Sequence, residues 1–297
     1  MRFVKMTGIG NDYVYINGFE EAIDDPARQA VAMADRHFGI GSDGLILIVP
    51  PDDDTKAHVR MRMFNADGSE SEMCGNGIRC VCKMVHDHGI GPDPQANPLN
   101  IQTGAGVLAV SYEVNAVGKV KHATVDMGAP ILTPEQVPID AESLVQTDQP
   151  QTFKVSVPGT TQRFNATFVS MGNPHAVIFV DEVDDEQREE LLGWGKALER
   201  HEAFPSRMNI HFAQVLDREH VRVLHWERGS GPTLACGTGA CAVCVAGVLT
   251  DRTEPEITAH LPGGDLKLSW TQSLRPHKGH IFMTGPATEV FTGEWPG

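Results

Sequence analysis

The chain repeats one short phrase, which reads MCGNGIRCVC at residues 73–82 and ACGTGACAVC at residues 235–244. Each stretch contains a Cys-Gly-x-Gly sequence, which begins at Cys74 in the first stretch and at Cys236 in the second. All six cysteines of the chain lie within these two stretches. The rest of the sequence can therefore be tested for a repeat at the same spacing.

The spacing of 162 residues between Cys74 and Cys236 also relates other parts of the sequence. Three further features have a counterpart 162 residues later in the sequence. Gly10-Asn11 corresponds to Gly172-Asn173, Val59-Arg60 to Val221-Arg222, and Phe64 to Trp226. Several matches at one offset indicate two copies of one supersecondary unit. The sequence therefore predicts an internal duplication, and its 297 residues are enough for two domains.

Each copy shows the same order of expected elements. Strands that turn at a Gly-Asn corner are expected at residues 3–18 and 163–180, and alternating strands at 58–64 and 220–226. A helix is expected after each Cys-Gly phrase, and the second one, GACAVCVAGVLTD at 239–251, is apolar on every face. Such a helix is typical of a buried core. Two amphipathic surface helices are expected at 25–39 and 185–201.

The composition excludes several classes of protein. A hydrophobic content of 41% and a charged content of 21% are typical of a globular chain rather than a disordered one. With a formal net charge of −15 and no run of Lys or Arg, a nucleic-acid partner is not expected. We find no leader pattern and no apolar run that could cross a bilayer, so we expect a cytoplasmic protein with free thiols and no membrane partner.

A cysteine at the start of a helix is chemically special. The first N–H groups of a helix lack intrahelical partners and carry the positive end of the helix dipole, which favours anions. The sequence therefore predicts that the pKa of both helix-start thiols is lowered and that the adjacent N–H groups bind a carboxylate. Two such sites facing one another across a cleft suit a racemase, in which one sulfur removes a proton and the other returns one.

The cysteines could also be core residues, zinc ligands or a redox pair. The remaining four fit small core residues of the expected helices: Cys80, Cys82, Cys241 and Cys244. A zinc site lacks the paired short knuckles that structural zinc requires, so no metal is expected. A redox dithiol is disfavoured because the only C-x-x-C, at Cys241 and Cys244, falls inside the apolar helix.

Seven phrases of the sequence together resemble the diaminopimelate epimerase family: TGIGNDYVYI, HFGIGSDGLIL, FNADGSESEMCGNGIRC, SMGNPHAVIF, RMNIHF, WERGSGPTLACGTGACA and MTGPATEVF. They occur in the order of the family and extend over the whole chain. The related proline racemases carry His where this chain has Asn76, and the phenazine-biosynthesis relatives lack the cysteine pair.

The resemblance implies an isomerase that interconverts L,L- and meso-diaminopimelate without pyridoxal phosphate or another cofactor, in lysine and peptidoglycan precursor biosynthesis. It implies an α+β fold of two pseudo-symmetric domains, each a strand-rich barrel around a central helix, with the active site in the interdomain cleft. The N-terminal domain is expected at residues 1–125, with a strand at about 280–297 returning to it, and the C-terminal domain at 126–279. The implied partners are a small-molecule substrate and a second copy of the chain in a homodimer.

The resemblance also implies roles for individual residues. Cys74 and Cys236 are the acid/base pair, and His175 and Glu227 tune the pKa of the thiols. The remaining positions bind substrate, through backbone donors beside the cysteines and through side chains that read its distal end: Asn11, Asn65, Gly75, Asn76, Asn173, Asn209, Glu227, Arg228, Gly237 and Thr238. Arg228 suits a carboxylate because its guanidinium is a planar fork of donors.

Two positions depart from what many family members carry. Gly44 stands where many have Gln, and Pro232 stands where many have Glu. These departures leave open a racemase that acts on another amino acid. A thiol-based metal-binding or redox protein is the alternative from a different class.

Overall fold

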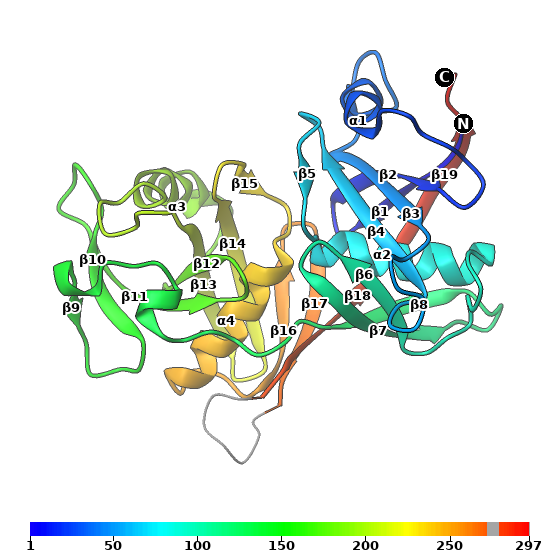
Figure 1. Ribbon diagram of the computed structural model, residues 1–297. Coiled ribbons are helices and arrows are strands. Elements are labelled where there is room, and N and C mark those ends of the chain that lie inside the picture. The colour runs from blue at the N-terminus through cyan, green and yellow to red at the C-terminus, as the bar shows by residue number, and fades with distance from the viewer. Residues whose placement is uncertain (272–278, 297) are drawn as a thin grey trace. The chain divides into compact units, whose positions relative to one another are not determined.

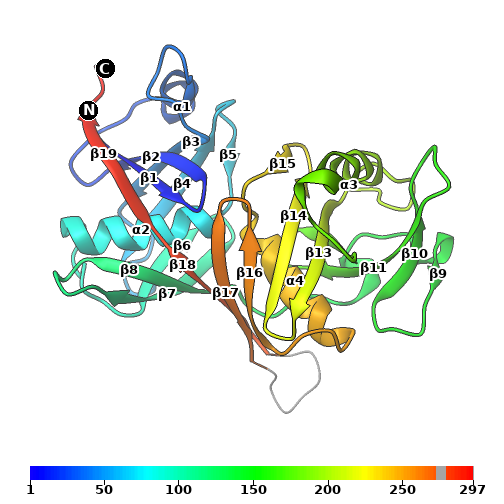
Figure 2. The same cartoon turned by 180° about the vertical axis from the view of Figure 1, so that it is seen from behind.

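The computed structural model describes residues 1–271 and 279–296. By their internal contacts, the residues divide into two compact units, Met1–Asp126 with Thr284–Gly297, and Met127–Met283. Figure 1 and Figure 2 label the elements of both units from opposite sides.

The first unit is a strand-rich sheet around helix α2. Its helices are α1 (Pro26–Ala34) and α2 (Gly75–His88), and its strands are β1 (Arg2–Gly8), β2 (Asn11–Asn17), β3 (Gly44–Val49), β4 (Val59–Asn65), β5 (Glu70–Ser71), β6 (Leu99–Thr103), β7 (Gly106–Val114), β8 (Val120–Asp126) and β19 (Thr288–Glu294). The sheet runs β19-β1-β2-β3-β4-β6-β7-β8, antiparallel except where β2 meets β3 and β4 meets β6. Because α2 contacts β1, β2, β6, β7 and β8, it lies at the centre of this unit.

The second unit repeats this arrangement. Its helices are α3 (Asp185–Leu198) and α4 (Gly237–Leu249), with short 3-10 turns at Pro134–Gln136 and Ala141–Ser143, and its strands are β9 (Val145–Gln146), β10 (Thr152–Ser156), β11 (Arg163–Ser170), β12 (Pro174–Phe179), β13 (Asn209–Asp217), β14 (His220–Glu227), β15 (Gly231–Thr233), β16 (Glu256–Leu261) and β17 (Gly264–Trp270). A further strand, β18 (Ile281–Pro286), spans the boundary of the two units and pairs with β8.

The order of the strands confirms the predicted duplication. In the second unit the sheet runs β9-β10-β11-β12-β13-β14-β16-β17, again antiparallel except at two places, β12 with β13 and β14 with β16. These parallel pairs correspond to β2 with β3 and β4 with β6 in the first unit. The predicted α+β fold with a repeated unit is therefore confirmed.

Helix α4 is enclosed by its own unit, as its apolar sequence predicts. Its side chains are buried from Ala240 to Ala246, and the helix contacts β11, β12, β13, β16 and β17. A helix without a polar face is stable in water only when surrounding elements cover it on every side. The sheet of the second unit provides this cover, and it fixes the position of Cys236 at the helix start.

Helix α1 ends earlier than expected. The sequence predicts a helix over residues 25–39, whereas α1 ends at Ala34. The Asp35 side chain accepts hydrogen bonds from the backbone N–H groups of His37 and Phe38. These side-chain bonds replace helical ones and turn the backbone, because Asp competes with the helix for neighbouring N–H groups.

Candidate active site

Cys74 is the N-cap residue of α2. Its sulfur accepts a hydrogen bond from the backbone N–H of Gly77 at 3.4 Å, in the first turn of the helix. The thiol also donates to Oδ1 of Asn11 at a distance of 3.2 Å. Asn11 is the first residue of strand β2. The structure thus brings two of the predicted site residues of the first unit into direct contact.

The amide of Asn11 is held in one orientation by an acidic neighbour. Its Nδ2 donates to a carboxylate oxygen of Asp43 at 2.7 Å, so Oδ1 is the atom that faces Cys74. Asp43 is held in turn by the guanidinium of Arg36 at 3.1 Å. Asp43 was not among the predicted site residues, although it stands directly before strand β3 in the phrase HFGIGSDGLIL, which carries part of the family resemblance.

The backbone around Cys74 is tightly packed. Gly75 and Asn76 form the buried first turn of α2, and the Asn76 side chain accepts from the Arg79 guanidinium at 3.1 Å. A Cβ atom on Gly8 would lie 2.8 Å from the Asn76 carbonyl oxygen, so glycine allows strand β1 to approach the helix start. Asn65, at the end of β4, donates to Ser69 at 2.9 Å.

Cys236 is the N-cap residue of α4, and its environment matches that of Cys74 in outline. Its sulfur accepts from the Gly239 N–H at 3.4 Å and lies 3.6 Å from the Thr238 hydroxyl. The residue is only 3% exposed. Each cysteine therefore begins the central helix of its unit with a backbone N–H aimed at its sulfur.

The predicted lowering of the thiol pKa is wrong for Cys236 in this structure. Burial raises its pKa well above the usual range, and the nearby carboxylate of Glu227 raises it further. The Thr238 hydroxyl and the Gly239 N–H act in the opposite direction but do not outweigh these effects. The donors at the helix start favour a thiolate, but the desolvation of a buried sulfur disfavours it more strongly. Cys236 therefore rests as a thiol, the form that can donate a proton.

The residues after strand β14 form a second group near α4. Glu227 ends β14 and accepts a hydrogen bond from the Thr233 hydroxyl, and Arg228 follows it with an exposed side chain. The Arg228 backbone N–H donates to the side chain of Asn209 at 2.8 Å, and the Asn209 amide donates to the Pro174 carbonyl at 2.8 Å. The structure thus links Asn209, Arg228 and the start of β12.

His175 reaches the helix start through two other predicted site residues. Its Nε2 lies 2.8 Å from Oδ1 of Asn173, whose Nδ2 donates to the Thr238 hydroxyl at 3.3 Å. Burial lowers the pKa of His175 to about 3, and electrostatic interactions with His225 and with the Arg228 guanidinium lower it further. The ring is therefore neutral at physiological pH and supplies no positive charge to a thiolate.

Two further histidines, neither of them among the predicted site residues, continue from His175 through side-chain contacts. His211 on β13 and His225 on β14 are fully buried, and they pair with each other in the register of the two strands. The alternation of HVRVLHW places His225 on the same strand face as Val221 and Val223, which are also buried. The alternating pattern thus predicts that His225 is buried. It does not predict that His211 of the neighbouring strand lies beside it.

The described residues hold no cluster of three or more His, Cys, Asp or Glu side chains arranged to bind a metal ion. No disulfide joins any two of the six cysteines, all of which lie in the described part of the chain. Within the same residues, no helix has both the length and the apolar character needed to cross a bilayer.

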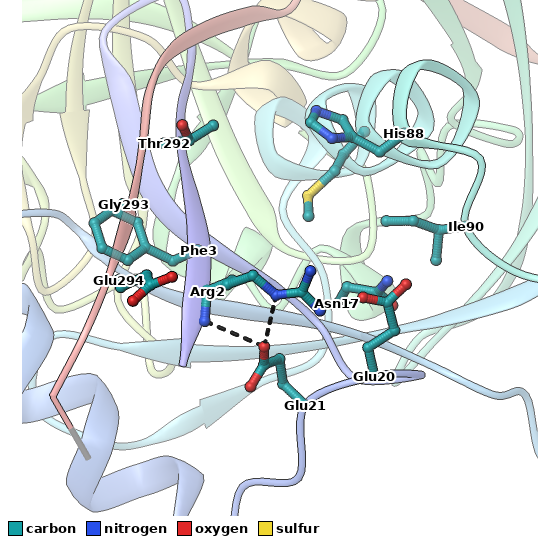
Figure 3. Close-up of a pocket in the computed structure, with 11 residues that line it drawn as sticks. Arg2, Phe3, Asn17, Glu20, Glu21, His88, Ile90, Thr292, Gly293 and Glu294 are labelled. Atoms are coloured by element: carbon teal, nitrogen blue, oxygen red, sulfur yellow. Dashed lines mark hydrogen bonds and ion pairs between the residues drawn. The ribbon is translucent and has the colours of Figure 1, made fainter.

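A pocket of the first unit lies apart from the predicted site residues. Its volume is about 440 Å³, and its walls come from β1, β19 and the end of α2 together with the segment after β2. Figure 3 shows Arg2 bonded to Glu21 at one side of this pocket, and His88 of α2 at the opposite side. None of the residues predicted for catalysis or substrate binding lines it.

Solved structures with this fold include racemases and epimerases. A probable proline racemase from Agrobacterium radiobacter aligns with a TM-score of 0.67 at 13% identity, over 99% of this chain and 92% of that one. A hydroxyproline epimerase from Agrobacterium vitis aligns with a TM-score of 0.65 at 14% identity, over 99% and 90%. The chain thus has the α+β fold found in these racemases and epimerases.

Sequence similarity narrows this class to one family. The family model described as diaminopimelate epimerase matches residues 3–133 and 167–290. The diaminopimelate epimerase of Agathobacter rectalis is 48% identical over 297 residues, covering 99% of both chains, and that of Desulfovibrio desulfuricans is 50% identical over 295 residues, covering 99% of this chain and 98% of the relative. The chain belongs to the diaminopimelate epimerase family.

Proposed function

We propose that the chain interconverts L,L- and meso-diaminopimelate without pyridoxal phosphate, and that the thiols of Cys74 and Cys236 are its two bases. The observation that carries this mechanism is the equivalence of the two sulfurs. Each is the N-cap of the central helix in a duplicated unit, and each accepts a backbone N–H at 3.4 Å. Duplicated acid/base groups suit a reaction that must run from either stereoisomer.

The proposed reaction moves one proton off the α-carbon and another one back. The thiolate form of one cysteine takes the α-proton, so the C–H bond breaks and an S–H bond forms. The thiol of the other cysteine then gives its proton to the opposite face of the same carbon. The enzyme ends with the protonation states of its two sulfurs exchanged, and the reverse direction uses them in the opposite roles.

The high pKa of Cys236 fits this scheme as the resting acid. A buried thiol holds its proton until negative charge develops on the carbon beside it, and it then donates that proton.

Backbone donors at the two helix starts are proposed to bind the carboxylate at the reacting carbon. Gly75 and Asn76 occupy the first turn of α2, and Gly237 and Thr238 occupy the first turn of α4. Helix starts bind carboxylates because their N–H groups and the helix dipole both favour an anion. In the transition state, the same donors stabilise charge that moves from the carbon onto the carboxylate.

The distal amino and carboxylate groups of the substrate are proposed to be read by polar side chains near these helix starts. In the second unit, Asn173 is bonded to Thr238 of α4 and Asn209 to Pro174 of β12. The Arg228 backbone is bonded to Asn209, and Glu227 accepts from Thr233. Arg228 is exposed, and Nη1 of its guanidinium donates a hydrogen bond to the Ser206 carbonyl at 2.9 Å. In the first unit, Asn11 and Asn65 are the corresponding side chains. His175 and Glu227 are proposed to adjust the reactivity of Cys236.

We also propose that residues 1–125 with the returning strand at about 280–297 form one domain and residues 126–279 the other. Free thiols at all six cysteines support a cytoplasmic location, where thiols stay reduced. The net charge of −15 supports a small-molecule partner over nucleic acid. A homodimer and the absence of a cofactor are carried over from the resemblance to the family.

The test is proton NMR of L,L-diaminopimelate incubated with the reduced protein in heavy water. The expected result is loss of the signal from one α-hydrogen as meso product forms. Cys74→Ala and Cys236→Ala should each abolish epimerisation while leaving the circular dichroism spectrum unchanged. Cys244→Ala is the matched control, since this cysteine is fully buried within α4 and burial raises its pKa to about 12.

Two results would contradict the proposal. If Cys236→Ala or Cys74→Ala kept wild-type epimerisation, the two-thiol mechanism would be wrong. If diaminopimelate kept its α-hydrogen while proline or glutamate lost theirs, the assigned substrate would be wrong.

A further inference from the structure

Three buried histidines form one hydrogen-bonded chain in the second unit. His175 on β12, His211 on β13 and His225 on β14 each have 0% of their surface exposed. Nδ1 of His175 lies 2.8 Å from Nε2 of His211, and Nδ1 of His211 lies 2.7 Å from Nδ1 of His225. Neighbouring strands thus carry an unbroken row of imidazole rings.

This row packs directly against the first turn of α4. A Cβ atom on Gly239 would lie 2.4 Å from Cε1 of His211 and under 3 Å from both of its ring nitrogens. Gly239 is also the residue whose N–H points at the Cys236 sulfur. The middle ring of the row therefore supports the backbone that holds this thiol.

All three rings are neutral at physiological pH. Burial lowers the pKa of His175 and of His225 to about 3, and it lowers that of His211 well below its ordinary value, with further lowering by His225 and His175. A neutral imidazole has one nitrogen that donates and one that accepts. Each ring in the row must therefore donate on one side and accept on the other.

The orientation that the Asn173 amide has in this structure corresponds to one direction of these bonds. Its Oδ1 can only accept, so Nε2 of His175 donates to it and Nδ1 of His175 accepts from His211. It follows that Nδ1 of His211 accepts from Nδ1 of His225.

The far end of the row requires the same direction. Nε2 of His225 is buried and has no hydrogen-bond partner among the described residues. A buried N–H without an acceptor is rarer in proteins than an acceptor that is left unsatisfied. A lone pair at this nitrogen therefore costs less than a proton, which places the His225 proton on Nδ1, facing His211.

The near end of the row reaches the catalytic sulfur. Nδ2 of Asn173 donates to the Thr238 hydroxyl at 3.3 Å, and this leaves the hydroxyl proton free to point at Cys236, whose sulfur is 3.6 Å away. If the row ran in the other direction, the Asn173 amide would turn over and the Thr238 proton would point at Asn173. The thiolate of Cys236 would then lose a donor.

We propose that His211 and His225 are positioning residues of the epimerase reaction, which set the direction of a hydrogen-bond chain from His225 through His211, His175, Asn173 and Thr238 to the sulfur of Cys236. The proposal rests on the proposed role of Cys236 in catalysis. The groups that bear on this sulfur are the Glu227 carboxylate from β14, which opposes the thiolate, and the Thr238 hydroxyl and Gly239 N–H from α4, which favour it. The row of histidines keeps one of the two favourable donors in place.

The first test measures the tautomers in the unmodified protein. Nitrogen NMR of protein labelled with ¹⁵N-histidine distinguishes a protonated ring nitrogen from an unprotonated one. The expected result is a proton on Nε2 of His175, on Nε2 of His211 and on Nδ1 of His225. A proton on Nε2 of His225 would reverse the chain and overturn the proposal, and this measurement needs no variant to fold.

The second test measures the reactivity of Cys236 itself. The rate of its alkylation by iodoacetamide is followed against pH by mass spectrometry of the peptide that contains it. His225→Leu removes the donor to His211, so alkylation at a fixed pH should slow by about fivefold, the effect of one weak hydrogen bond. His225→Asn keeps a side-chain N–H at the position of Nδ1 and should restore the wild-type curve.

Thr238→Val tests the other end of the chain. It should slow alkylation of Cys236 as much as His225→Leu does, and the double variant should be no slower than Thr238→Val alone, because both changes remove the same donor. The pH profile of kcat/KM should shift in parallel. His201→Leu is the matched control, a buried histidine outside the row that should leave both curves unchanged.

The outcomes separate this proposal from the proposed function. Additive effects of His225→Leu and Thr238→Val, or wild-type curves in both, would overturn the hydrogen-bond chain even if Cys236→Ala is inactive. An active Cys236→Ala variant would instead overturn the catalytic role of Cys236, while the alkylation curves would still report on the chain.

Discussion

Replacement of Gly239 by Ala tests whether the helix start and the row of histidines act as one packed unit. Gly239 lies in the first turn of α4, where alanine is normally the better helix former by about 1 kcal/mol. Here the added Cβ would lie 2.4 Å from Cε1, 2.8 Å from Nε2 and 2.9 Å from Nδ1 of His211. The whole ring would have to move by about 1 Å to reach ordinary carbon contact distance.

The ring has no easy direction in which to move. His211 is held by His175 at 2.8 Å on one side and by His225 at 2.7 Å on the other, and all three are buried. A shift that relieves the overlap weakens at least one of these bonds, at about 1 kcal/mol, and adds overpacking strain of about 1–3 kcal/mol. Against a gain of about 1 kcal/mol in helix propensity, the net loss in the free energy of unfolding is about 1–3 kcal/mol.

Urea denaturation followed by tryptophan fluorescence measures this loss. Three of the four tryptophans, Trp194, Trp226 and Trp270, lie in the second unit, so the signal reports mainly on the unit that contains the change. Epimerase activity is measured in parallel and should fall at least about tenfold, because a displaced Gly239 N–H no longer points at the Cys236 sulfur.

Gly193→Ala is the matched control. This glycine lies within α3, is exposed, and would have no atom within 4 Å of an added Cβ. It should raise the free energy of unfolding by about 0.5–1 kcal/mol without changing activity. If Gly239→Ala showed the same gain and kept wild-type kcat, the packing argument for the helix start would be refuted.

Two further predictions concern pH and the position of Gly44. The free energy of unfolding should fall as the pH drops from 7 to 5, because the three buried histidines stay neutral when folded, with a pKa of about 3 for His175 and for His225, but bind protons near pH 6.5 once unfolded. His225→Asn should make this slope shallower by about 1 kcal/mol per pH unit, as followed by urea denaturation at each pH, and an unchanged slope would contradict the assignment of neutral rings. Gly44→Gln should destabilise the chain by about 3 kcal/mol or more, since a Cβ there would lie 2.0 Å from the Phe64 carbonyl oxygen and 2.9 Å from the Tyr13 ring. Wild-type stability of that variant in thermal denaturation would show that β3 can move away from β4.

The sequence predicted the fold through features that depend on periodicity and on repetition. The apolar helix after Cys236 and the alternating strands at 58–64 and 220–226 are patterns of burial, and the structure confirms them as α4, β4 and β14. The end of α1 could not be predicted in the same way. It depends on whether the Asp35 side chain bonds to the N–H groups of His37 and Phe38, and this local competition leaves no periodic trace.

Site residues that belong to a sequence motif could be predicted from the sequence. Site residues that are brought together by contacts between strands could be predicted less well. The Cys-Gly-x-Gly phrases located Cys74 and Cys236 at the helix starts. The raised pKa of Cys236 depends on burial and on Glu227, which come together only in the folded chain. The meeting of His211 and His225 depends on the register between β13 and β14, and one strand sequence cannot reveal the register of its neighbour.

The pairing of β1 with β19 has a consequence for how the chain is made. Translation produces β1 before the unit Met127–Met283, but its neighbour β19 only after that unit. During that interval β1 pairs with β2 on one side, while the other side presents unpaired backbone groups, a template for adhesion between nascent chains. The second unit is continuous in sequence and can complete its own sheet first. Of the two units, the one whose first strands are translated earlier is therefore the one that is completed later.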